Sequence, residues 1–79
     1  MQPFKDADRV RAMFAQGQTQ LVDRATGYKY SMLARCTRDG EYAAVVRTEK
    51  AEEHLSRVTF RCPACLSEFE AAPEDIYVC

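Results

Sequence analysis

Residues 57–65 read RVTFRCPAC, and this stretch decides the fold more than any other part of the chain. Apolar and polar side chains alternate from Arg57 to Cys62, which is the pattern of a half-buried strand. A second cysteine, Cys65, follows after two residues, and a tight turn between the two can aim both sulfurs at one centre. Cysteine pairs with this spacing commonly supply two of the four ligands of a zinc ion. The stretch therefore predicts a strand that leads into a metal-binding turn.

Upstream of this strand, residues 28–48 are predicted to form a central β-hairpin. Side chains alternate along both arms, and the pair Asp39-Gly40 between them is typical of a two-residue turn in which both positions take positive φ. Cys36 lies on the same strand face as the apolar side chains of Met32 and Ala34. We therefore expect the Cys36 sulfur to point into the core.

The N-terminal segment, about residues 4–16, is predicted to be an amphipathic helix. Val10, Met13 and Phe14 follow the i, i+3, i+4 spacing of one helix face, and Gly17 is placed to end the helix in a left-handed conformation. A helix followed by several short strands predicts a domain of the α+β class. In this prediction the helix packs on a small antiparallel sheet, and a zinc-knuckle hairpin over about residues 57–79 completes the C-terminal end.

The composition allows one small domain over residues 1–79 with a thin core. Only fifteen of the 79 residues are Leu, Ile, Val or Phe. Small chains with few large apolar side chains often depend on a metal, on disulfides or on a partner for stability. The composition thus gives the four cysteines a structural reason to bind a metal.

The segment from Arg57 to Cys79 resembles the zinc-ribbon family. The resemblance rests on the Cys-Pro-x-Cys knuckle of Cys62 and Cys65, on Phe69 four positions later, and on Cys79 after a returning strand. It covers the C-terminal part of the chain only, and Cys79 alone represents the second knuckle. The resemblance implies that Cys62, Cys65 and Cys79 are zinc ligands.

Cys36 is expected to be the fourth ligand, because its strand face directs it inward. The predicted metal site is therefore Cys36, Cys62, Cys65 and Cys79, with Zn²⁺ as the ion. Several alternatives remain open for the fourth position: His54, the terminal carboxylate, a partner chain, or no ligand, with Cys36 then a small buried core residue. Four thiolates can also hold iron, and a Cys-x-x-Cys pair can instead cycle between dithiol and disulfide.

Charge and hydropathy indicate the compartment and the partner. The net charge is −1, with +3 on residues 1–61 and −4 on residues 62–79. No apolar run reaches the length of a membrane span, the N-terminus has no secretory signal pattern, and paired cysteines suit a reducing compartment. We therefore expect a cytoplasmic protein. The near-neutral charge favours a protein partner over nucleic acid, which usually requires a dense basic patch.

The function predicted from the sequence is that of a small non-enzymatic accessory or protein-interaction module with a structural zinc site. A redox or electron-transfer protein that uses the same cysteines is the main alternative. A nucleic-acid-binding zinc module is the second alternative, because cations and aromatic side chains mix in one stretch of the sequence. These residues are Arg24, Tyr28, Lys29, Tyr30, Arg35 and Arg38.

Overall fold

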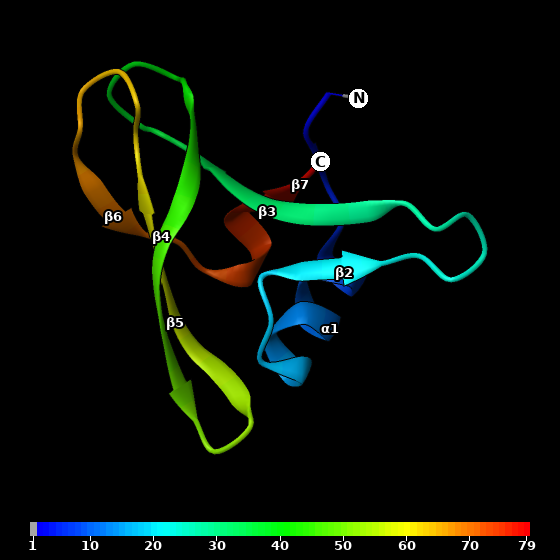
Figure 1. Ribbon diagram of the computed structural model, residues 1–79. Coiled ribbons are helices and arrows are strands. Elements are labelled where there is room, and N and C mark those ends of the chain that lie inside the picture. The colour runs from blue at the N-terminus through cyan, green and yellow to red at the C-terminus, as the bar shows by residue number, and fades with distance from the viewer. Residues whose placement is uncertain (1) are drawn as a thin grey trace.

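A computed structural model describes residues 2–79, and within this range it contains one α-helix, seven strands and a short 3-10 helix (Figure 1). In chain order these are β1 (Phe4–Lys5), α1 (Ala7–Gln16), β2 (Gln20–Val22), β3 (Lys29–Arg35), β4 (Tyr42–Ala51), β5 (His54–Arg61), β6 (Glu68–Glu70), η1 (Pro73–Asp75) and β7 (Ile76–Val78). All strand pairs are antiparallel.

The strands join into one sheet with the order β1-β7-β3-β4-β5-β6. β2 pairs with the first part of β3, and β4 pairs with the last part of the same strand. In Figure 1, β4 and β5 run steeply across β3, so the sheet is strongly twisted. Because of this twist, the long β4–β5 hairpin and the β2–β3 hairpin run in clearly different directions.

The predicted fold class is wrong. Strands account for 46% of the described residues and helices for 17%, so the chain is a mainly antiparallel β structure instead of a helix on a small sheet. The strands are longer and more numerous than the alternation indicated, because the β4–β5 hairpin continues through polar residues to a turn at Glu52. The first helical residues predicted, Phe4 and Lys5, instead form β1 and pair with β7.

α1 begins later than predicted because Asp6 caps it. The Asp6 carboxylate accepts a hydrogen bond from the backbone N–H of Arg9, which satisfies an orphan donor at the helix start. Val10 and Met13 on this helix are completely buried, whereas Phe14 is only partly buried. The helix packs against β5 and β7. The core residues it covers include Met32, Ala34, Val58, Phe60, Ile76 and Val78.

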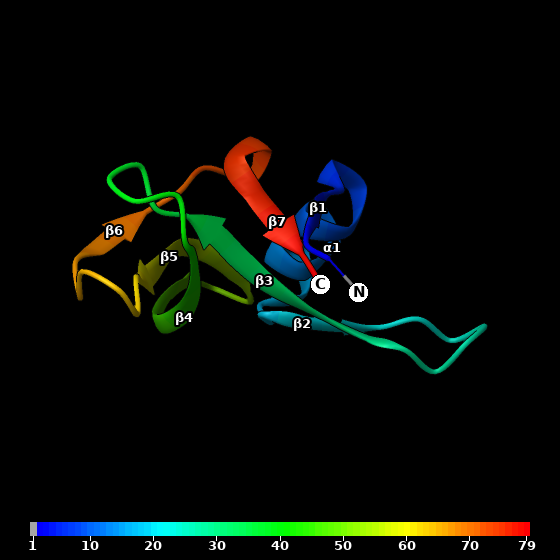
Figure 2. The ribbon, with the colours of Figure 1, turned by 90° about the horizontal axis from the view of Figure 1, so that it is seen from above.

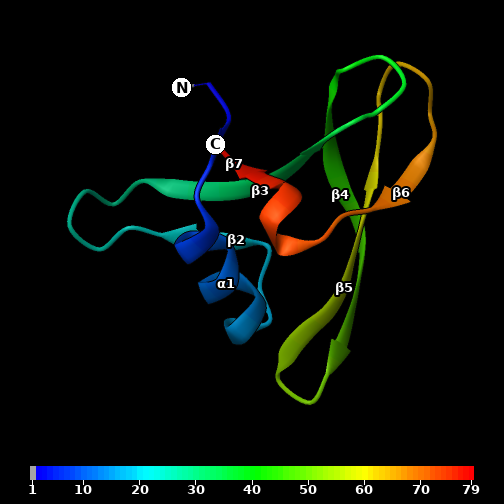
Figure 3. The same cartoon turned by 180° about the vertical axis from the view of Figure 1, so that it is seen from behind.

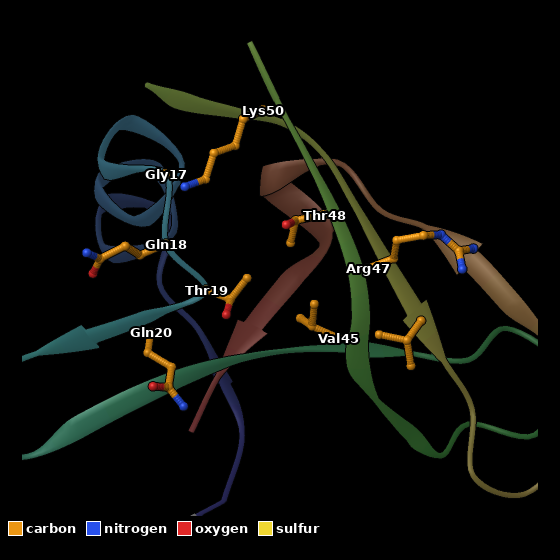
Figure 4. Close-up of a pocket in the computed structure, with 9 residues that line it drawn as sticks. Gly17, Gln18, Thr19, Gln20, Val45, Arg47, Thr48 and Lys50 are labelled. Atoms are coloured by element: carbon orange, nitrogen blue, oxygen red, sulfur yellow. The ribbon is translucent and has the colours of Figure 1, made fainter. Parts of the chain in front are cut away.

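Gly17 ends α1 in a left-handed conformation with φ 68°, and it lies against the turn of the β4–β5 hairpin. A Cβ at this position would lie 2.4 Å from the carbonyl oxygen of Glu53 and 3.3 Å from Cε of Lys50. Figure 4 shows the Lys50 side chain extending toward Gly17. The helix end and the hairpin therefore approach each other too closely for any residue but glycine.

Gly17→Ala is therefore expected to lower the free energy of unfolding by about 2–3 kcal/mol, because a left-handed conformation costs about 1 kcal/mol for alanine and the clash with a backbone oxygen adds to it. Gly27→Ala is the matched control, since Gly27 has φ 74° but no atom within 4 Å of an added Cβ. It is expected to cost about 1 kcal/mol. Urea unfolding of the two variants measures the difference, and equal losses would show that the close approach to Glu53 carries no energy.

Candidate metal centre

Two loops at one end of the molecule bring four potential metal ligands together. The β3–β4 loop provides Cys36 and Asp39, and the β5–β6 loop provides Cys62 and Cys65. Their sulfur and carboxylate oxygen atoms all lie within 4.8 Å of one another. The two loops lie side by side in Figures 1 and 3, and Figure 2 shows them at the end of the molecule opposite the β2–β3 turn.

The two loops have the same backbone hydrogen bonds. In the first loop, the N–H of Cys36 donates to the carbonyl of Glu41 at 2.8 Å, and the N–H of Gly40 donates to the carbonyl of Cys36 at 2.9 Å. In the second loop, the N–H of Cys62 donates to the carbonyl of Ser67 at 3.0 Å, and the N–H of Leu66 donates to the carbonyl of Cys62 at 2.9 Å. The two loops therefore form the same type of turn, and in each loop the first cysteine makes both of these hydrogen bonds.

The residue after the second ligand has a positive φ in both loops. Gly40 has φ 77°, and Leu66 has φ 63° although a bulky side chain disfavours this conformation. The left-handed residue reverses the chain directly behind the ligand pair, so that the next strand can start. Asp39 in the first loop thus occupies the position that Cys65 occupies in the second.

Two contacts within the cluster, one between Cys36 and Cys65 and one between Cys62 and Asp39, match the edges of a tetrahedron around zinc. With Zn–S bonds of about 2.3 Å and a Zn–O bond of about 2.0 Å, neighbouring sulfurs lie about 3.8 Å apart and a sulfur lies about 3.5 Å from an oxygen. The sulfurs of Cys36 and Cys65 are 3.8 Å apart. The sulfur of Cys62 lies 3.5 and 3.4 Å from the two carboxylate oxygens of Asp39. The four groups could therefore hold one ion.

Hydrogen bonds and burial shift the pKa values of Asp39 and Cys62 in opposite directions. The backbone N–H of Glu41, at 2.9 Å from Asp39 Oδ1, holds the pKa of Asp39 below its usual value, and thiol donors lower it further. For Cys62, backbone N–H groups of Cys65 and Ala64 lower the pKa, but burial and the hydrogen bond to Asp39 outweigh them and raise it to about 11. At neutral pH the Cys62 thiol therefore donates to an ionised Asp39, and a metal ion must displace that proton.

Cys65 differs from Cys62 because it lies at the surface. Hydrogen bonds from the side chain and the backbone of Ser67 lower the pKa of its thiol. Cys36 and Cys62 are 4% and 0% exposed, whereas Cys65 and Asp39 are exposed. In each loop the first ligand therefore lies in the core and the second faces solvent.

Of the four cysteines predicted as ligands, the structure brings Cys36, Cys62 and Cys65 together and does not include Cys79 in this group. Cys79 follows β7 and exchanges backbone hydrogen bonds of 3.1 Å with Ser31, at the opposite edge of β3 from β4. His54 begins β5 at the distal end of the hairpin and does not belong to the group either.

Asp39 is the potential ligand that the sequence did not predict. Asp39-Gly40 is typical of a two-residue turn, but the connection between β3 and β4 spans residues 36–41. The missed signal is an internal match between RCTRDG at residues 35–40 and RCPACL at residues 61–66. Both segments place arginine before the first ligand, and a second potential ligand three positions after it.

A groove of about 520 Å³ lies elsewhere, between the α1–β2 connection and β4 (Figure 4). Its lining is mostly polar and includes Gln18, Thr19, Gln20, Arg47 and Thr48. It contains none of the four clustered ligands. The cysteine and aspartate cluster is therefore a separate site that the loops alone create.

The fold and the cluster define a small antiparallel β structure with two matched ligand loops. No family model, no curated protein and no solved structure matches the chain. Within residues 2–79, no helix has the length and apolar character needed to cross a membrane.

Proposed function

We propose that the chain is a non-enzymatic interaction module whose fold is held together by one zinc ion bound to Cys36, Asp39, Cys62 and Cys65. The observation that carries the proposal is the agreement of two cross-loop contacts, Cys36 to Cys65 at 3.8 Å and Cys62 to Asp39 at 3.4 to 3.5 Å, with two edges of a zinc tetrahedron. Each loop contributes two ligands. The ion would therefore join the β3–β4 loop to the β5–β6 loop across the sheet.

The ligand set favours zinc. Thiolates select zinc and iron over hard cations such as Mg²⁺ and Ca²⁺, and zinc also accepts a carboxylate oxygen. Iron centres in electron carriers are most commonly held by cysteine alone, whereas this site offers three sulfurs and one carboxylate. The geometry therefore supports zinc over the redox alternative.

The closed coordination supports a structural role. Catalytic zinc sites usually keep one position open for water or substrate, whereas structural sites use four protein ligands. Here four protein groups converge, and two of them, Cys36 and Cys62, are buried in the core. The free energy of zinc binding would then add to the folding stability of a chain with few large apolar residues.

Metal content separates the ligand set proposed here from the set predicted by sequence alone. The protein as purified in reducing buffer is expected to contain one zinc per chain by elemental analysis and native mass spectrometry. Cys62→Ser and Asp39→Ala should reduce zinc retention after dialysis at least tenfold, since each removes a ligand. Cys79→Ser is the matched control and should retain one zinc.

Two outcomes would contradict this proposal. The first is loss of zinc in Cys79→Ser together with full retention in Asp39→Ala, which would return the fourth ligand to Cys79. The second is iron as the metal, visible as colour in the purified protein, which would favour the electron-transfer alternative.

A further inference from the structure

The face of the sheet that points away from α1 carries one continuous row of side chains. Register pairs join Lys5 to Tyr77, Tyr77 to Leu33, Leu33 to Ala44, Ala44 to Arg61, and Arg61 to Glu68. Their neighbours along the strands, Val78, Met32, Ala43 and Phe60, are buried beneath α1 or in the core. The row crosses all six strands of the main path and belongs to the uncovered face.

Two tyrosines form an aromatic platform on this outer face. The rings of Tyr42 and Tyr77 meet edge to face with centroids 5.3 Å apart, and Tyr42 is 36% exposed. The Lys5 ammonium lies 5.4 Å from the centroid of the Tyr77 ring. Exposed aromatic rings beside cations are the arrangement on which nucleic-acid bases stack while their phosphates meet positive charge.

Four cations on the outer face have no acidic partner among residues 2–79: Lys5, Arg35 and Arg61 near the ligand loops and β1, and Lys29 at the far end of β3. The acidic residue in the row, Glu68, is paired with Arg47. Glu70 also lies on this face, where it approaches Arg57 at 4.0 Å, and it lines a groove with Lys5, Arg35 and Asp75. Glu41 lies in the loop before β4. The two glutamates on the strands of this face thus pair with arginines, and Lys5, Arg35 and Arg61 remain as positive charges without an ion pair.

The ligand loops position two of these cations. Arg35 ends β3 directly before Cys36, and Arg61 ends β5 directly before Cys62. Nε of Arg35 also donates to the carbonyl of Gly40 at 3.1 Å, which leaves its terminal amino groups available. A metal ion bound between the loops would hold the two arginines at a constant separation.

We propose that this outer face, formed by Lys5, Arg35, Tyr42, Arg61 and Tyr77, binds single-stranded nucleic acid. Four strand spacings separate Lys5 on β1 from Arg61 on β5, a span of about 19 Å. A single strand laid across the sheet would meet a cation at each end of this span and stack a base on Tyr42 between them. The proposal goes beyond the zinc site and rests on it only for the constant position of the two arginines.

In the structure, the tyrosines and two of the arginines of the basic and aromatic cluster predicted from the sequence lie at opposite ends of β3. Tyr28 and Tyr30 pack on each other at 4.7 Å, and the guanidinium of Arg9 lies 4.4 Å from the centroid of the Tyr30 ring. Arg35 and Arg38 lie at the other end of β3, by the ligand loops. Tyr28 and Tyr42 are similarly exposed, at 39% and 36%, and each packs edge to face on another tyrosine. The outer face differs in that Arg35 and Arg61 share it with Tyr42.

The test measures fluorescence anisotropy of fluorescein-labelled dT and rU 12-mers with the full chain in its metal-loaded form. Both are expected to bind, with log K falling by about 2 per tenfold rise in salt, because about three phosphates are neutralised. Tyr42→Ala should weaken binding about tenfold through lost stacking. A large preference for rU over dT would assign recognition to the ribose hydroxyl, and equal binding would assign it to base and phosphate.

A matched pair of variants tests the role of the face. Lys5→Gln with Arg35→Gln and Arg61→Gln should weaken binding at least tenfold and bring the salt slope toward zero. The control Arg11→Gln with Arg24→Gln and Lys50→Gln removes the same charge from exposed positions away from the face, since Lys50 lies beside Gly17 on the α1 side, and should change affinity less than twofold. Zinc content of both variants is measured first, which separates failure of this proposal from failure of the zinc site.

Three results would overturn the proposal. These are an absence of binding at 20 mM salt, equal weakening by the two triple variants, and equal affinity for a polyglutamate peptide of matched charge. The last result would identify the face as a site for acidic protein segments.

Discussion

Chelation of the metal is expected to abolish the cooperative thermal unfolding of this protein. Structural zinc contributes about 10–16 kcal/mol of apparent binding energy in small zinc-dependent domains, more than the stability of most domains. The core here has few large side chains, and two of the proposed ligands, Cys36 and Cys62, are themselves core residues. Circular dichroism melting in reducing buffer with and without EDTA measures the effect, and zinc in excess over EDTA should restore the transition.

Cys62→Ser provides the control for chelation. This variant lacks a ligand, so EDTA should change its melting curve little, whereas Cys79→Ser should respond like the natural chain. Hydrogen exchange of the metal-free protein should rise most in the ligand loops, residues 36–41 and 62–67. A melting curve of the natural chain that EDTA leaves unchanged would show that the cluster binds no metal of structural importance.

Phe60→Ala is expected to lower the free energy of unfolding by about 3–5 kcal/mol, the usual range for a buried phenylalanine replaced by alanine. Phe60 is completely buried on β5, pairs with Val45 on β4, and stacks on Phe69 of β6 with ring centroids 6.0 Å apart. It thus supports the strand end that delivers Arg61 and Cys62 to the ligand loops. Denaturant unfolding of the zinc-loaded protein measures the loss.

Val46→Ala is the comparison for Phe60→Ala. Val46 is 47% exposed and lies at the register shift between β4 and β5, so its truncation should cost less than 1 kcal/mol. Similar losses for the two variants would mean that the packing of Phe60 against Phe69 does not stabilise the fold.

Several elements could be predicted from local pattern. The helix ending at Gly17, the strand from Arg57 to Cys62, and the inward direction of Cys36 all follow from periodicity and turn chemistry within about ten residues. The fold class could not be predicted in the same way. β1 and β7 are two- and three-residue strands whose pairing depends on segments more than seventy positions apart.

The candidate site was also predictable only where it depends on a local sequence pattern. The Cys62 and Cys65 pair is visible as a local motif, but the partner loop contains an aspartate in the second ligand position. Asp39 followed by Gly40 is typical of a hairpin turn, and only the hydrogen bonds of the folded loop show its equivalence to Cys65-Leu66. Cys79 has the right residue type, but β7 pairs with β3 on the edge away from the loops.

The unequal exposure of the two ligands in each loop determines how an ion would enter and leave. Asp39 and Cys65 face solvent, whereas Cys36 and Cys62 lie behind them in the core. A chelator or a competing thiol can reach only the outer pair while the protein stays folded, and the inner pair releases the ion only when a loop opens. The lifetime of a bound ion would therefore be governed by the opening rate of the loops, and metal exchange would report on local unfolding.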